Sequence, residues 1–335
     1  MEWCYLERPH RIILAVRSDG KILCQTYLNE HQIYAWTLWE TDGEVESICN
    51  VPEGQDDYAY VVVKRTINGA SVKYVEQLQP RSFTDIKDAF FVDSALTYDG
   101  TNAVVISGAT VADPVVVTAT SHPYENGDKV YISGVVGMTE INEREFTVAS
   151  KTTHTFQLAG ENGSGHTAYG SAGVAQLLLY STSTILNLDH LEARTDVLAL
   201  LDGNIESDIT CAGGAIPTSN GFIKIVVGLP YTATFESLPT NVVKEVVSKR
   251  KKIHGVIIRV LDTRGIYAGT DLTSMEEYPS RELELWGDPA ATVTDVVRLN
   301  IPSDWKRDTS VFIQSEPGLP QTILSIVPDV SEGGG

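Results

Sequence analysis

The chain has 335 residues, of which 42% are hydrophobic, and its 44 acidic and 25 basic residues give a formal net charge of −19. This length and hydrophobic content suit about two domains with real cores, which excludes a wholly disordered or fibrous protein. So acidic a protein does not hold nucleic-acid phosphates over a broad surface. No segment approaches the ~18 consecutive apolar residues of a membrane span, so we expect none.

Apolar residues at every second position predict β-strands through the first hundred residues. The turns at 18–20, 41–43 and 68–69 each contain glycine, and they separate the strands into three expected hairpins. Asn68-Gly69 supplies the positive φ angles that a tight turn requires. A short helix is expected at 81–89. The expected strands are residues 11–16, 21–27, 33–39, 45–49, 58–65 and 71–78.

Residues 103–178 change in composition, with many Gly, Thr, Val and Ser residues and few basic ones. We expect them to form a small β-barrel-like insertion. Beyond it, a short helix is expected at 241–252. A C-terminal β-sandwich is predicted from strands at 222–227, 255–261, 281–286, 294–299, 311–314 and 322–327.

The predicted fold is therefore mainly β, with sheet or sandwich host domains, a small inserted β-barrel-like module and few short helices. Residues 1–100 are expected to form the N-terminal β region of the host domain, and 101–180 the inserted module. Residues 181–330 would continue the host domain and form the C-terminal sandwich. The glycine-rich tail, 331–335, is expected to be disordered.

No motif in the sequence indicates catalysis. The histidines are scattered without an HxH or HExxH pattern, the cysteines are far apart, and neither GxSxG nor GxGxxG occurs. We therefore expect no catalytic, cofactor-binding or metal site, no enzyme activity, and mostly buried, reduced thiols. Adjacent acidic residues arise by chance in so acidic a chain, and they occur at Asp56-Asp57, Glu276-Glu277 and Glu282/Glu284.

One run of four cations, Lys249, Arg250, Lys251 and Lys252, is unusual in this acidic chain. It is expected at the end of the 241–252 helix, where cations complement the helix dipole. It is also a candidate subunit contact, because a positive patch attracts the carboxylates of a neighbouring acidic subunit. Contact with a nucleic-acid phosphate is the other interpretation.

The insertion carries 122–135 (HPYENGDKVYISGV), 137–142 (GMTEIN), 144–148 (REFTV) and 155–158 (TFQL). These segments resemble the small β module related to the first catalytic-cysteine half-domain of ubiquitin-activating enzymes, a module that also appears in phage structural proteins. The chain has no cysteine between Cys49 and Cys211. The module therefore brings no thioester chemistry, and without a GxGxxG loop an activating enzyme is not expected.

The flanking segments resemble a second family, the tail nozzle proteins of short-tailed phages, also called tail tubular protein B. The matching segments follow the order of that family. They are 17–23 (RSDGKIL), 26–27 (TY), 35–36 (AW), 63–69 (VKRTING), 74–76 (YVE), 189–192 (DHLE), 228–231 (GLPY), 250–253 (RKKI) and 259–265 (RVLDTRG).

This resemblance implies a structural virion protein, assembled in the host cytoplasm and located in the phage tail. It implies a homo-oligomer, a hexameric ring that contacts other phage tail proteins and forms the conduit for genome ejection. Double-stranded DNA would pass through without tight binding, and an acidic wall suits such passage because DNA carries one charge per roughly 1.7 Å of its axis.

An alternative function is a virion-associated or secreted β protein that binds or cleaves glycans. Its stacking platforms would be exposed aromatic side chains among Tyr58, Tyr60, Trp286 and Trp305, and its carboxylates would come from the acidic pairs. Isolated aromatic residues in strands are more often part of a core.

Overall fold

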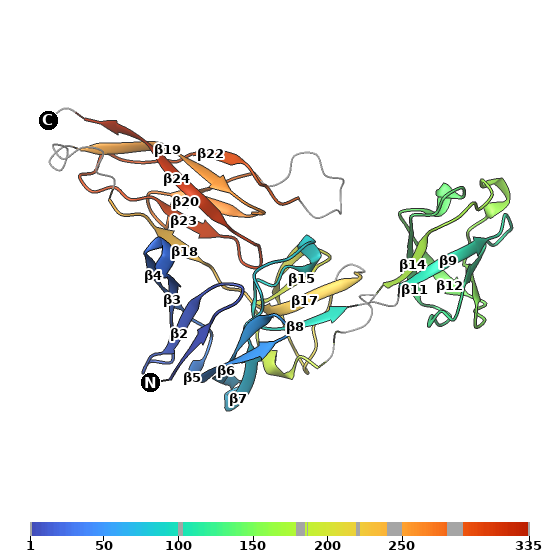
Figure 1. Cartoon of the computed structure of the whole chain (residues 1–335). Coiled ribbons are helices and arrows are strands. Elements are labelled where there is room, and N and C mark those ends of the chain that lie inside the picture. The colour runs from blue at the N-terminus through green and yellow to red at the C-terminus, as the bar shows by residue number, and fades with distance from the viewer. Residues whose placement is uncertain are drawn as a thin grey trace. The chain divides into compact units, whose positions relative to one another are not determined.

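A computed structural model describes residues 2–99, 103–178, 185, 187–218, 222–239, 250–279 and 291–333 (Figure 1). The chain is built almost entirely of β-strands and contains a closed barrel, which confirms the predicted fold class. Two compact units are present. We call Met1–Ala95, Asp189–Gly213 and Val227–Gly335 the host unit, and Leu96–Leu188 with Gly214–Val226 the barrel unit.

Two sheets form a sandwich at the N-terminal end of the host unit. One sheet has the order β1-β2-β3-β4 and the other β5-β6-β7, and their buried side chains share one hydrophobic core. Alternation along each strand sends one set of side chains into this core and the other set outward. The strands are β1 (Trp3–Leu6), β2 (Ile12–Val16), β3 (Ile22–Leu28), β4 (Ile33–Trp39), β5 (Glu44–Glu53), β6 (Asp56–Ile67) and β7 (Ala70–Gln77).

Two of the three expected hairpins form. β2 pairs with β3, and β6 pairs with β7 across Asn68 and Gly69, whose φ angles are 45° and 77°. The third is wrong: β4 pairs with β3, and the chain crosses at 41–43 to start the second sheet. A side chain at Gly43 would approach the Lys64 carbonyl oxygen to 2.8 Å, so only glycine fits this crossing.

Neither expected helix, at 81–89 or at 241–252, is seen among the residues that the structure describes. Residues 81–89 contain only η2 (Ile86–Asp88), a single turn in which the Asp85 carboxylate accepts the Lys87 N–H at 3.1 Å. So short a segment gains too few hydrogen bonds to propagate a helix. Residues 241–249 lie outside the described residues. The other helical turns are η1 (Asn29–His31), η3 (Thr139–Ile141), η4 (Gly163–Gly165) and η5 (Asp189–Leu191).

The insertion folds into a closed barrel with the strand order β10-β13-β12-β11-β14-β9 (green in Figure 1). Tyr124, Phe156 and Met138 are fully buried in its core. Its first and last strands pair, with Val105 opposite Val174. The strands are β9 (Val104–Ala109), β10 (Val116–Ala119), β11 (Lys129–Ser133), β12 (Arg144–Ala149), β13 (Thr155–Leu158) and β14 (Val174–Leu178).

The barrel unit extends beyond the expected 101–180. Ile185 and Ile216 exchange backbone hydrogen bonds of 3.2 Å, and this bridge brings residues 214–226 into the unit. A further sheet has the order β16-β15-β17-β8. Its strands are β8 (Asp93–Asp99), β15 (Val197–Leu201), β16 (Asn204–Ile209) and β17 (Lys224–Leu229).

The C-terminal part of the host unit is a second sandwich. Its sheets, β18-β23-β20-β21 and β22-β19-β24, share a core that includes Ile258, Leu299 and Ile313. The expected strand at 281–286 lies outside the described residues. The strands are β18 (Thr234–Glu236), β19 (Lys251–Val260), β20 (Ile266–Gly269), β21 (Met275–Glu277), β22 (Val296–Asn300), β23 (Phe312–Ser315) and β24 (Ile323–Glu332).

The predicted disorder of the tail is wrong for its first residues. β24 continues through Ser331 and Glu332, which lie opposite Lys252 and Lys251, and the Gly333 N–H donates to the Arg250 carbonyl at 2.8 Å. Pairing with β19 therefore orders a segment whose composition alone indicates flexibility.

We predict that residues 101–180 fold on their own, because the barrel is closed and its ends leave from paired strands about 4.8 Å apart. The excised segment should unfold in one cooperative transition, measured by circular dichroism during heating. The host, with this span replaced by a short Gly/Ser linker, should also keep a cooperative transition. If the excised segment melts without cooperativity and the shortened host collapses, the barrel belongs to the host core.

Candidate functional site

The run of four cations at 249–252 lies at the start of strand β19. Lys249 lies outside the described residues, Arg250 is exposed just before β19, and Lys251 and Lys252 are the first residues of β19. The predicted helix end is therefore wrong for Lys251 and Lys252. Pairing with Glu332 and Ser331 of β24 holds this segment extended.

The alternation of β19 separates the cations of this segment. Lys251 is fully buried, and its backbone exchanges hydrogen bonds of 2.7 and 3.0 Å with Lys306. Lys252, on the opposite face of the strand, is half-buried. Lys251 is thus an interior side chain and not a surface contact, whereas Arg250 and Lys252 remain available to a partner.

The outer face of the β22-β19-β24 sheet adds cations that are distant in sequence. Arg259 is exposed on β19, and Arg298 of β22 lies opposite Ile257. Arg298 pairs with Asp329 at 3.0 Å, while Arg259 and Lys252 have no ion-pair partner among the described residues. We call Arg250, Lys252, Arg259 and Arg298 the basic face. Exposed Val296 and Val327 lie among these cations.

A buried charge network lies in the N-terminal sandwich. The Arg65 side chain is 2% exposed and binds Glu76 through two hydrogen bonds, of 2.6 and 2.7 Å. It also reaches Asp93 at 3.2 Å and donates to the Asp42 carbonyl at 2.6 Å. Burial opposes the charge of Arg65, but the hydrogen bonds to Glu76 and the charge of Asp93 outweigh burial and raise its pKa.

The same network extends to the segment that follows the barrel in sequence. Arg194 pairs with Asp42 and, through two hydrogen bonds of 2.8 and 2.7 Å, with Asp196. His190 contacts the Ser94 carbonyl at 2.9 Å, and burial lowers the pKa of its imidazole. These contacts connect the segment after the barrel to the crossing loop at 41–43 and to β8.

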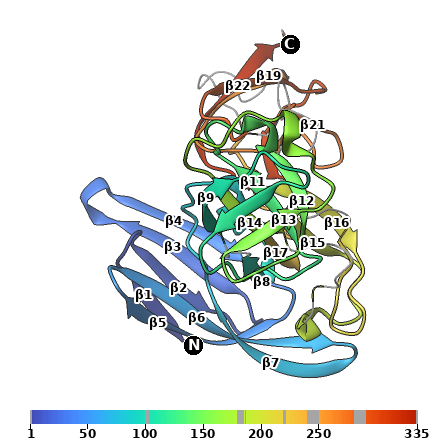
Figure 2. The same ribbon diagram turned by 90° about the vertical axis from the view of Figure 1, so that its right-hand side faces the viewer.

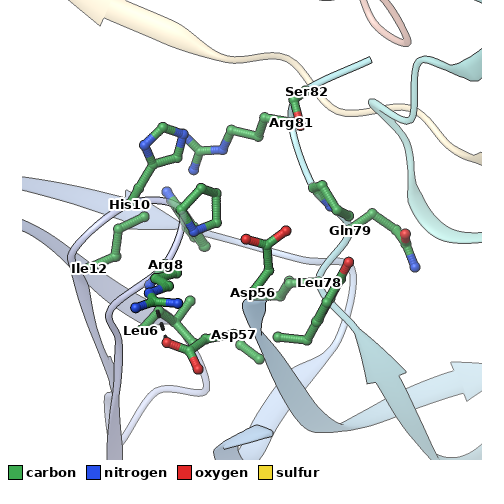
Figure 3. A pocket seen from close by; sticks show the side chains of 15 residues that line it. Leu6, Arg8, His10, Ile12, Asp56, Asp57, Leu78, Gln79, Arg81 and Ser82 are labelled. Atoms are coloured by element: carbon green, nitrogen blue, oxygen red, sulfur yellow. Dashed lines mark hydrogen bonds between the residues drawn. The ribbon is translucent and has the colours of Figure 1, made fainter. Parts of the chain in front are cut away.

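A pocket beside β1 and β6 contains the Asp56-Asp57 pair (Figure 3). The Arg81 guanidinium lies 4.8 Å from the centre of the Trp39 ring at this pocket. Asp57 accepts the backbone N–H groups of Glu7 and Arg8 at 2.7 and 3.2 Å. Asp57 therefore fixes the loop after β1.

Glycoside hydrolysis uses two carboxyl groups on opposite sides of the scissile bond. In the acidic pair of this pocket, Asp57 Oδ2 accepts both backbone N–H groups, and Asp56 is exposed. Of the proposed aromatic platforms, Tyr58 lines this pocket, Tyr60 donates to Glu53 at 2.5 Å, and Trp305 is exposed. Trp286 lies outside the described residues.

Glu276 and Glu277 are successive residues of β21, so their side chains point to opposite faces of the sheet. Glu277 lies opposite Tyr267 on β20. It interacts with Glu316, a residue that the sequence did not single out. Burial, followed by the Glu277 charge, raises the pKa of Glu316. Glu282 and Glu284 are outside the described residues.

The described residues contain no group of three side chains suited to hold a metal ion. In the same part of the chain, no helix has the length and hydropathy to cross a membrane. Cys4, Cys24 and Cys211 are buried free thiols and Cys49 is exposed. Burial raises the pKa of Cys4 to about 11, which keeps this thiol protonated.

Residues 113–178 match the family profile of the ubiquitin-activating enzyme E1 FCCH domain. The match covers β10 to β14 of the barrel and confirms the module that the sequence indicated from residues 122–158. It covers a minor part of the chain and does not reach the host unit. No curated protein matched the chain.

We predict that Arg65→Met destabilises the protein by about 3–5 kcal/mol, because it leaves the carboxylates of Glu76 and Asp93 partly buried without their cation. Arg17→Met, at an exposed position outside the basic face, should change stability by no more than about 1 kcal/mol. Urea unfolding at neutral pH measures both free energies. Equal, small losses in the two variants would show that the network contributes little.

Proposed function

We propose that this chain is a structural subunit of the tail nozzle of a short-tailed phage. Copies assemble in the host cytoplasm into a hexameric ring, which becomes part of the virion tail with other tail proteins. The ring forms the lower conduit for genome ejection. Double-stranded DNA passes through the ring without tight binding, and the chain performs no enzymatic reaction.

The distribution of the two resemblances supports this proposal. All nozzle-like segments, from 17–23 to 259–265, fall in the host unit, although the barrel separates them in sequence. The E1 FCCH match falls at 113–178, within the barrel unit. The nozzle-like segments therefore lie in one compact unit, and the matched module lies in the other. This agreement between sequence order and compact body is the observation that carries the proposal.

The charge of the chain also suits a conduit. The chain carries a net charge of −19, and acidic side chains on a channel wall would repel DNA phosphates, so that DNA would slide past instead of adhering. Copies of such a chain also repel one another, and a ring needs local surfaces that offset this repulsion. The basic face, with unpaired Lys252 and Arg259 among the described residues, supplies one such surface.

We predict that the purified full-length chain forms a closed hexamer. Native mass spectrometry measures its mass, and negative-stain electron microscopy checks for a ring with a central channel. A chain that remains monomeric at high concentration and releases products from bacterial polysaccharides would contradict the nozzle proposal. That result would favour the glycan-cleaving alternative.

We predict that replacing Arg250 and Lys252 together by Gln weakens the ring at low salt. Each exposed ion pair is worth about 0–1 kcal/mol, and a ring repeats the loss at every interface. Dissociation on dilution should therefore begin at a several-fold higher concentration than in the unchanged chain. The difference should shrink at high salt, where screening shortens the range of these charges.

A matched control removes the same net charge elsewhere. Arg17→Gln with Lys73→Gln breaks exposed pairs with Asp19 and Glu46 and should leave the dissociation unchanged. Lys251 is omitted from the test because replacing a buried residue would disturb the sandwich. Equal behaviour of the two double variants at both salts would exclude the basic face as a subunit contact. If the Arg250/Lys252 double variant keeps an intact ring but retains DNA less well than the unchanged chain, the basic face contacts DNA phosphates.

A further inference from the structure

The outer face of the β1–β4 sheet is lined with aromatic and aliphatic side chains. The four strands lie side by side (Figure 2), and their inner face holds buried Cys4, Leu14 and Cys24. The register aligns the opposite face in three rows across the sheet. We call the following residues the aromatic face: Trp3, Tyr5, Ile13, Ala15, Leu23, Gln25, Tyr27, Tyr34, Trp36 and Leu38.

The β4 side of this face is unusually open. Trp36 is 58% exposed, Tyr34 50% and Leu38 45%, and Trp3 at the opposite edge is 66% exposed. β4 is also an edge strand, with no pairing partner beyond it among the described residues. Exposed apolar surface gathered in one patch marks an interaction site in a soluble protein, whereas single exposed residues do not.

The chemistry of the aromatic face favours a protein partner over a sugar. A glycan platform needs flat rings next to hydrogen-bonding groups, yet aliphatic Ile13 and Leu38 lie among these rings. The Tyr27 and Tyr34 rings are tilted by 53°, and the Tyr34 hydroxyl donates to Asn29 at 2.7 Å. An apolar centre with aromatic side chains is typical of protein interfaces.

The border of the aromatic face is polar and neutralised. Lys21 pairs with Glu40 at one end of the rows, and Arg11 pairs with Glu30 at the other. These pairs cancel the charge beside the patch, although the whole chain carries −19. Two copies therefore meet little like-charge repulsion at this surface.

We propose that the aromatic face of one copy docks on the basic face of the next copy, an inference that rests on the proposed ring. A closed ring needs two different surfaces on each subunit, and these two faces are complementary. Arginine and lysine bind the faces of Trp and Tyr rings through cation–π contacts. Val296 and Val327, exposed between the cations, supply apolar contacts for the aliphatic side chains.

The size of the aromatic face also suits a ring. Its ten side-chain positions, each covering about 4.8 Å across the strands by about 6.8 Å along them, give roughly 330 Å². That area is less than half of the roughly 800 Å² that each partner buries in a stable pairwise complex. An isolated pair held by this contact alone is weak, whereas ring closure adds the same contact at every interface.

Leu38→Lys tests the aromatic face, because it places a cation opposite the partner's cations. The matched control is Val75→Lys, which changes a side chain that is 74% exposed on β7. Native mass spectrometry should find the ring lost in Leu38→Lys and intact in Val75→Lys. A cooperative unfolding transition of Leu38→Lys, with a melting temperature equal to that of Val75→Lys at a dilution where both are monomeric, would show that Leu38→Lys still folds.

Cysteine trapping tests which surface is the partner. In a Cys49→Ser background, which removes the exposed native thiol, Trp36→Cys and Arg259→Cys are placed in separate copies. Mild oxidation of the mixture should give a disulfide-linked dimer in much higher yield than either variant alone. A mixture of Val75→Cys with Arg259→Cys is the control. Equal yields in the two mixtures, or a Trp36→Cys chain that links efficiently to itself, would overturn the proposed pairing of faces.

The outcomes separate this inference from the nozzle proposal. A ring that survives Leu38→Lys overturns the docking surface and leaves the ring in place. A simple dimer that Leu38→Lys disrupts, with cross-links between the two faces, supports the contact but contradicts the hexamer. A monomeric chain with no cross-links contradicts both. A retained ring together with loss of polysaccharide binding in Leu38→Lys would make the aromatic face a glycan platform, and the docking proposal wrong.

Discussion

The arrangement of the host unit depends on how the buried Arg65 guanidinium is satisfied. A cation taken out of water on β6 needs hydrogen bonds for its N–H groups, and Glu76, Asp93, Thr41 and the Asp42 carbonyl provide them. These groups come from β7, the start of β8 and the crossing loop between the two N-terminal sheets. Asp42 in turn pairs with Arg194, beyond the barrel in sequence. One buried charge therefore links the segments on both sides of the insertion.

Alternation and turn residues predicted most strands of the N-terminal sandwich, because a half-buried strand carries a period of two in its sequence. In the C-terminal sandwich they missed the short strands β18, β20 and β21, and the strand expected there at 222–227 belongs to the sheet with β15 and β8. They could not distinguish a hairpin from a crossing at 41–43. Both need a glycine turn, and the deciding contacts are distant in sequence: Gly43 lies against the Lys64 backbone, and Asp42 accepts from Arg65. The tail shows the same limit, since pairing with β19 orders Ser331 and Glu332.

The candidate contact surfaces were only partly visible in the sequence. The basic run was evident, but strand alternation buries Lys251 and leaves Lys252 on the outer side. Arg259 and Arg298 lie on the same sheet face as Lys252 because β19 pairs with β22. No local sequence pattern predicts that pairing. The aromatic face had a signal: residues 33–39 (IYAWTLW) lack the polar alternation of a strand with one solvated face. A strand apolar on both sides is either central in a core or covered by a partner, and β4 is at an edge.

The difference between closed and open sheets accounts for the position of both candidate contact surfaces in the host unit. The barrel pairs its first strand with its last, so it presents no free strand edge, and its ends leave side by side. Such a module can be inserted without changing the sheets that flank it. The host sheets are open and end in edge strands such as β4 and β24, whose neighbouring faces carry the exposed aromatic and basic side chains. Open sheets need either protective charges or partners at their edges. The proposed pairing of an uncharged aromatic face with a basic one would cover exposed apolar side chains beside these edges and limit the repulsion between acidic copies.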